Sequence, residues 1–72
     1  MSLNASLGIR VNGEQRRVEC GSSVAAMLRA LGIDPSRVAV ERNLEVVPRS
    51  ALDQMRVEDG DEYEIVHFVG GG

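Results

Sequence analysis

Three consecutive glycines, Gly70 to Gly72, follow an apolar segment at the end of the sequence. Glycine has no side chain, so such a tail can enter a channel in another protein that is too narrow for other residues. The α-carboxylate of Gly72 is ionised at neutral pH, since its unperturbed pKa is about 3.3–3.7. It can attack the α-phosphorus of ATP, and a sulfur nucleophile or an amine can then displace AMP. The tail indicates carboxylate activation, with a frayed terminus or a linker remnant as the alternative. If the chain continues past Gly72, proteolytic trimming must come first.

The other residue types that carry chemistry occur singly. His67 is the only histidine and Cys20 the only cysteine, so the chain lacks the clustered ligands of a metal site. We interpret Cys20 as a small apolar residue buried in a strand, because free cysteine is usually buried, with a nucleophile or a sulfur relay as the alternative. The acidic segment at 58–62 lacks the spacing of a calcium-binding loop and fits a tight turn. The sequence therefore predicts no metal, no catalytic residue and no self-sufficient enzyme.

Size and composition limit the function classes. The chain has 72 residues, 43% of them hydrophobic, which suits one small domain with an aliphatic core. A net charge of −3 and an isoelectric point near 5.0 argue against general nucleic-acid binding. No apolar run reaches the roughly 20 residues of a membrane helix, and the first residues do not resemble a signal peptide. We expect a cytoplasmic protein in which residues 1–6 are disordered or derived from cloning.

The first half of the sequence predicts a β-hairpin followed by a helix. Residues 7–11 and 15–20 alternate as strands do, and Asn12-Gly13 between them tolerates the positive φ angles of a tight turn. Ser22 or Ser23 can cap the helix that follows, and Gly32 can end it. The apolar side chains at helical spacing are Val24, Met27, Leu28 and Leu31.

The second half predicts further strands and a short helix. Strands are expected at 37–43, with Val38 and Val40 on one face, and at 45–47, before Pro48. Ser50 is expected to cap a short helix at 51–55 with Leu52 and Met55 facing inward. A turn at Asp59-Gly60 precedes the last strand, at 63–69. Because the main helix must pack on one face of the sheet, the expected fold is a two-layer α+β domain of four or five strands.

Three segments of the sequence resemble the ThiS family, the sulfur carrier proteins of thiamine biosynthesis. They are VNGE at 11–14, VAVERNLEVVPRS at 38–50 and VEDGDEYEIVHFVGGG at 57–72. The third is the most specific, because it joins the acidic turn, the final strand and the glycine tail at one spacing. The resemblance spans about residue 7 to the end. It implies a β-grasp, ubiquitin-like domain at 7–69, with a four- to five-stranded mixed sheet, one main helix on one face, a short second helix and a flexible tail at 70–72.

The resemblance also implies a reaction in which other proteins supply the catalysts. A ThiF-type adenylyltransferase related to E1 enzymes would use ATP to adenylate the carboxylate of Gly72. A cysteine desulfurase or sulfurtransferase would provide the sulfur that converts the adenylate to a thiocarboxylate. A ThiG-type thiazole synthase would accept that sulfur. Gly71 completes the diglycine and Gly70 extends the arm, so the chain would bind no cofactor and would act as a co-substrate rather than an enzyme.

We expect the residues next to the tail to contact these partners. Phe68 and Val69 are the predicted anchors, and His67 lies beside them at the surface or in the interface. Strand alternation places Ile65 and Phe68 on opposite faces, so we assign Ile65 to the core and Phe68 to the interface. Ordinary core packing is the alternative for Phe68.

Three other functions share parts of this pattern. A sulfur carrier for molybdopterin synthesis would share the fold, the tail and the adenylation step, but would deliver sulfur to a different acceptor. A ubiquitin-like protein modifier would use an amine as the acceptor. A plain interaction domain would carry an incidental tail. The segments VERNLEVV and EIVHFVGGG favour the thiamine group.

Overall fold

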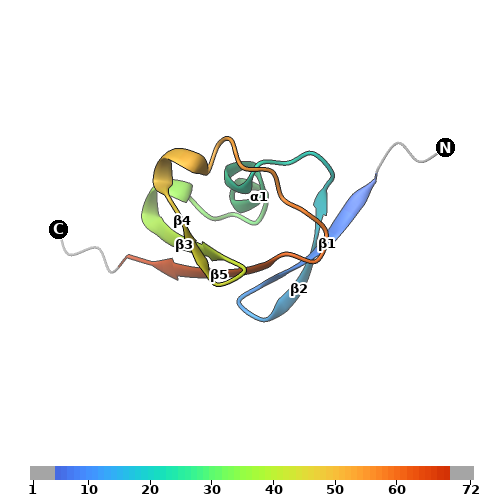
Figure 1. The fold of residues 1–72 in the computed structure, drawn as a ribbon, viewed down its shortest axis with the longest axis horizontal. Coiled ribbons are helices and arrows are strands. Elements are labelled where there is room, and N and C mark those ends of the chain that lie inside the picture. The colour runs from blue at the N-terminus through green and yellow to red at the C-terminus, as the bar shows by residue number, and fades with distance from the viewer. Residues whose placement is uncertain (1–4, 69–72) are drawn as a thin grey trace.

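The chain forms a five-stranded sheet that curves around one helix (Figure 1). The computed structural model describes residues 5–68. In chain order the elements, in which η denotes a 3-10 helix, are β1 (Ser6–Val11), β2 (Glu14–Glu19), α1 (Val24–Ala30), η1 (Pro35–Arg37), β3 (Val38–Arg42), β4 (Glu45–Val47), η2 (Arg49–Ala51) and β5 (Glu62–His67). β1 begins one residue before the predicted domain start at residue 7.

The last strand of the sequence lies in the middle of the sheet. The spatial order is β2-β1-β5-β3-β4, and β5 is parallel to β1 and antiparallel to β3. This arrangement confirms the mixed sheet and the β-grasp architecture that the family resemblance implies. In Figure 1, β5 (red) runs to the left, away from the β1–β2 hairpin on the right. The sheet is therefore completed only when the segment that leads to the tail is in place.

The hairpin between β1 and β2 turns where the sequence predicts. Asn12 and Gly13 have φ angles of 51° and 84°, and Val11 pairs with Glu14 across the turn. Two consecutive positive φ angles match the right-handed twist of the flanking strands, and Asn-Gly adopts them at low cost.

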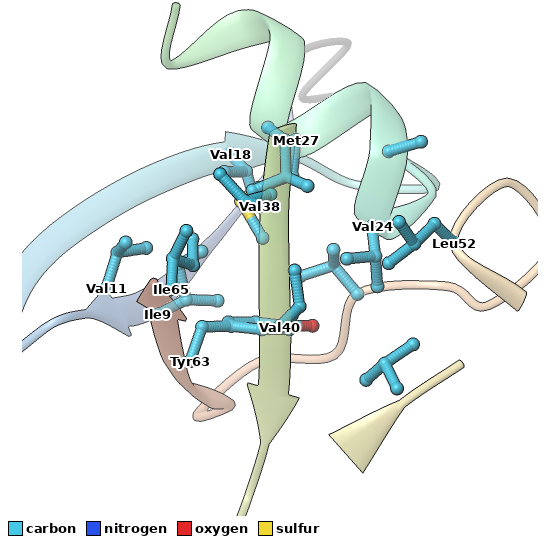
Figure 2. Close-up of a cluster of buried hydrophobic side chains, with 14 residues drawn as sticks. Ile9, Val11, Val18, Val24, Met27, Val38, Val40, Leu52, Tyr63 and Ile65 are labelled. Atoms are coloured by element: carbon cyan, nitrogen blue, oxygen red, sulfur yellow. The ribbon is translucent and has the colours of Figure 1, made fainter. Parts of the chain in front are cut away.

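The helix α1 packs the predicted apolar stripe against the sheet. Ser23 is its cap, because the Ser23 hydroxyl oxygen accepts a hydrogen bond from the backbone N–H of Ala26 at 3.0 Å. Gly32 closes the end with a φ angle of 81°. Figure 2 shows side chains from α1 meeting those of the strands in a single cluster. The buried core consists of Ile9, Val11, Val18, Val24, Ala25, Met27, Leu28, Val38, Val40, Val47, Leu52, Val57, Tyr63 and Ile65.

The helices in the described part of the chain are short. At seven residues α1 is the longest of them, and none has the length and apolar character to cross a membrane.

The short second helix lies earlier than predicted, and the expected cap at Ser50 is wrong. The 3-10 helix η2 spans Arg49–Ala51. Pro48 occupies its N-cap position, and no side chain caps the helix. Pro48 has a φ angle of −60° and a ψ angle of 146°, so it is extended and the helical turn begins at the next residue, Arg49, without a capping side chain. Leu52 is buried as predicted, and Met55 packs against the edge of the core.

Candidate functional site

Two of the predicted functional residues, His67 and Phe68, lie in the described part of the chain. Val69 and the tail at 70–72 lie outside the described residues. The structure therefore shows how the strand that leads to the tail is fixed and which side chains surround its end.

Side chains of β5 alternate between the core and the solvent. Tyr63 and Ile65 are buried on the helix side, whereas Val66 is 61% exposed. Phe68, directly after the strand, is 53% exposed. The assignment of Ile65 to the core and of Phe68 to the surface is confirmed, while contact of Phe68 with a partner stays a prediction.

A buried carboxylate fixes the start of β5. Asp61 is only 5% exposed and accepts four hydrogen bonds. The donors are Arg42 Nε at 2.9 Å, Asn43 Nδ2 at 3.1 Å, the backbone N–H of Glu58 at 2.9 Å and the hydroxyl of Tyr63 at 2.8 Å. Burial by itself would raise the pKa of Asp61, but the four hydrogen bonds together hold it below its ordinary value.

The Asp61 network joins two segments that are distant in sequence, the end of β3 and the acidic turn that leads into β5. It connects the acidic turn to Arg42 and Asn43 at the end of β3 and to Tyr63 in β5. Burial and the hydrogen bond to Asp61 raise the pKa of Tyr63, so its hydroxyl remains a proton donor. The acidic segment is a turn, as predicted, closed by Gly60 with a φ angle of 86°. Within residues 5–68 no group of three or more His, Cys, Asp or Glu side chains is arranged to hold a metal ion.

The side chain of Asn12 extends the ladder between β1 and β5. Its Oδ1 accepts from the backbone N–H of Ile65 at 2.7 Å, and its Nδ2 donates to the Ile65 carbonyl at 3.2 Å. The backbone N–H of Asn12 also donates to the Tyr63 carbonyl at 2.8 Å. Asn12 therefore shapes the hairpin turn and holds the middle of β5, whereas the sequence indicated only its turn role.

The end of β5 presents apolar side chains to solvent. Val66 pairs with Ala39 of β3 across the exposed face. Phe68 and Val46, which is 72% exposed, line one groove with Ala39. We call Val46, Val66 and Phe68 the apolar surface. Exposed apolar side chains gathered in this way are typical of protein-binding sites.

Arg49 contacts Phe68 and was not identified from the sequence. Its guanidinium carbon lies 5.6 Å from the centroid of the Phe68 ring. Its Nη1 donates to the carbonyl of Ser36 at 3.1 Å and approaches that of Pro35 at 3.5 Å. No periodic pattern could have revealed this contact, because it depends on how η1, η2 and the end of β5 meet in space.

The interpretation of Cys20 as a buried strand residue is wrong. β2 ends at Glu19, and Cys20 is exposed in the turn that follows. Gly21 has a φ angle of 91°, so the chain leaves the strand before the alternation that begins at Val18 can place the thiol in the core.

Comparison with known proteins decides the family. Residues 9–72 match the profile of the ThiS family, and the match includes the glycine tail. The chain belongs to the ThiS family. The fold described above is similar to that of a solved structure from this family.

Individual members and relatives agree with this assignment. A crystal structure of the thiamine biosynthesis protein ThiS from Geobacter metallireducens has a TM-score of 0.75 and 38% identity, covering 92% of this chain and 100% of that chain. The sulfur carrier protein ThiS of Bacillus subtilis is 36% identical over 50 residues, covering 69% of this chain and 76% of that protein.

A longer relative carries a similar segment. A thiazole synthase from Paramagnetospirillum magneticum is 53% identical over 62 residues, which cover 86% of this chain and 19% of that protein. The chain thus spans about a fifth of the length of this relative.

Proposed function

We propose that this chain is the sulfur carrier for thiazole formation in thiamine biosynthesis. The observation that carries the proposal is the ThiS family match, which runs through residue 72 and so includes the tail. In this role the chain is a co-substrate that is modified at Gly72, and the catalysts are other proteins.

The first step is activation of the tail by a ThiF-type adenylyltransferase. A carboxylate oxygen of Gly72 attacks the α-phosphorus of ATP, a new P–O bond forms and pyrophosphate leaves. The product is a mixed anhydride between Gly72 and AMP. The reacting group belongs to the main chain, so the three glycines can present it in a channel without carrying side chains into it.

The second step places sulfur on the activated carbon. Hydrosulfide attacks the carbonyl carbon, AMP leaves and the carboxylate becomes a thiocarboxylate. In the cell, a cysteine desulfurase or sulfurtransferase would supply the sulfur. If the donor is a protein persulfide, the first product is an acyl disulfide, and a second thiol must cleave it to release the thiocarboxylate.

The proposed acceptor is a ThiG-type thiazole synthase. Support comes from the relative in Paramagnetospirillum magneticum, since a protein named thiazole synthase contains a segment that is 53% identical to this chain. The similarity to the sulfur carrier of Bacillus subtilis points in the same direction. These relatives favour thiazole over molybdopterin as the destination of the sulfur.

Docking on the folded domain must offset the cost of ordering the tail. Fixing the backbone of the glycines costs about 1–2 kcal/mol per residue. We propose that the apolar surface contacts the partner and supplies part of the compensating free energy. His67 and Val69 flank Phe68 in sequence, and they complete the proposed interface.

The experiment measures ATP-dependent release of pyrophosphate by a ThiF-type adenylyltransferase, with a chain that ends at Gly72 as the substrate. We expect release to require the chain and to stop when Gly71 and Gly72 are deleted, while binding to the enzyme persists. An equal rate with the truncated chain would contradict the carrier role and would favour a plain interaction domain.

A further inference from the structure

Phe68, the last residue that the structure describes, is attached to η1 in two ways. Its backbone N–H donates to the carbonyl of Arg37 at 3.0 Å. Its ring lies under the guanidinium of Arg49, 5.6 Å from the centroid, and the same guanidinium donates to the carbonyl of Ser36 at 3.1 Å. The backbone and the ring of Phe68 are therefore linked to neighbouring residues of one short helix, the ring through Arg49.

From this geometry we propose that Arg49 is a positioning residue for the tail. It holds the Phe68 ring beside η1, where the Phe68–Arg37 hydrogen bond holds the backbone, and so restrains the last described residue before the tail. The proposal rests on the proposed function, because it concerns how the tail is presented to the adenylating enzyme.

The chemistry of the contact suits this role. A guanidinium is planar and can lie over an aromatic ring while its N–H groups still donate to carbonyl oxygens. An exposed phenylalanine without such a contact would exchange rotamers freely. Holding the ring in place beforehand reduces the conformational entropy that is lost when the partner binds.

The expected kinetic effect is on binding rather than on chemistry. Arg49 is on the folded domain and does not contact the reacting carboxylate in the proposed mechanism. Its loss should therefore raise the KM for the chain as a substrate of a ThiF-type adenylyltransferase and leave kcat unchanged. From the usual strength of an exposed cation–π contact, we expect KM to rise about three-fold.

The test combines Arg49→Ala, Phe68→Ala and the double variant. If Arg49 acts through Phe68, the double variant should have nearly the same KM as Phe68→Ala alone. Arg56→Ala is the matched control, because Arg56 Nη1 also donates to a loop carbonyl, that of Gly21 at 3.3 Å, but does not contact Phe68. Circular dichroism should first confirm that all four variants are folded at the assay temperature.

A second measurement does not depend on the enzyme. Backbone ¹⁵N relaxation should report a lower order parameter for the Phe68 amide in Arg49→Ala, and the wild-type value in Arg56→Ala. An unchanged order parameter, or effects of Arg49→Ala and Phe68→Ala on KM that simply multiply, would overturn the positioning role. If the wild-type chain were not adenylated at all, the proposed function would fail, while the relaxation data would still decide whether Arg49 orders Phe68.

Discussion

The two halves of β5 are fixed in different ways. The first half is held by polar side chains: the network of the buried Asp61 precedes it, and Asn12 bonds both backbone groups of Ile65. The second half, Val66 and His67, pairs with β3 as the first half does, but its side chains and that of the following Phe68 are exposed. The start of β5 is therefore fixed within the fold, whereas its end forms part of an exposed apolar surface next to the tail in sequence.

Substitutions at the two ends of β5 should therefore have different effects. Changes near Asp61 should lower the free energy of unfolding, because they remove interactions that join separate segments. Changes near Phe68 should leave the domain folded and weaken its use by a partner. Substitutions at Asp61, Asn12 and Val66 should reduce the stability of the domain in that order.

Replacing Asp61 with Ala should have the largest effect. The substitution leaves Arg42 without its buried partner and removes an acceptor from Tyr63. We expect the free energy of unfolding to fall by about 3 kcal/mol, a large part of the roughly 4–10 kcal/mol available to a domain of this size. Urea denaturation would measure the loss. The exposed Asp53, 3.6 Å from Arg29, is the control, and an equal loss for Asp53→Ala would contradict the special role of Asp61.

Stability should also depend on the ionisation of Asp61. The pKa of this carboxyl is lower in the folded chain than its ordinary value of 3.8, so its ionised form favours folding. The contribution is complete above that ordinary value and is lost as the pH falls through the folded pKa. The difference in unfolding free energy between the wild type and Asp61→Asn should therefore shrink on acidification below about pH 4. A difference that stays constant down to pH 2 would contradict this explanation.

Asn12→Gly should produce an intermediate loss. Glycine keeps the positive φ of the turn but cannot bond Ile65, so we expect a decrease of about 1–2 kcal/mol in unfolding free energy. Leu44→Gly is the matched control in the other hairpin, since Leu44 has a φ angle of 72° and an 87% exposed side chain. That control should keep or raise stability. Equal behaviour of the two variants would show that the Asn12 side chain adds nothing beyond its turn conformation.

Val66→Ser should change stability least. Val66 is exposed, so we expect the unfolding free energy to stay within about 0.5 kcal/mol of wild type, while the ThiF-dependent rate falls. Ile65→Val, one residue earlier, should do the reverse and cost about 1 kcal/mol without changing that rate. A rate that is unaffected by Val66→Ser would remove Val66 from the proposed interface.

The sequence predicted the parts of this fold that depend on local patterns. The Asn12-Gly13 turn, a serine cap at position 22 or 23 and the alternation that buries Ile65 and exposes Phe68 all follow from local chemistry, and the structure places the cap at Ser23. Those patterns involve neighbouring residues, whose conformational preferences act over one turn or one strand.

The contacts that could not be predicted join segments far apart in the chain. In the sequence Asp61 resembles the other acidic residues of the turn, yet it is buried and its carboxylate bonds Arg42, which lies 19 residues earlier. Arg49 meets Phe68 only because η1, η2 and β5 converge. The prediction for Cys20 failed for a local reason, because β2 ends at Glu19 and the turn at Gly21 leaves the thiol in solvent.

Intact-mass spectrometry can show whether the carboxylate of Gly72 receives sulfur. The chain ending at Gly72 is incubated with a ThiF-type adenylyltransferase, ATP and sodium sulfide. We expect the mass to rise by the difference between one sulfur atom and one oxygen atom, and fragmentation to place the change at Gly72. An unchanged mass, with an enzyme shown to be active on another ThiS protein, would contradict the account.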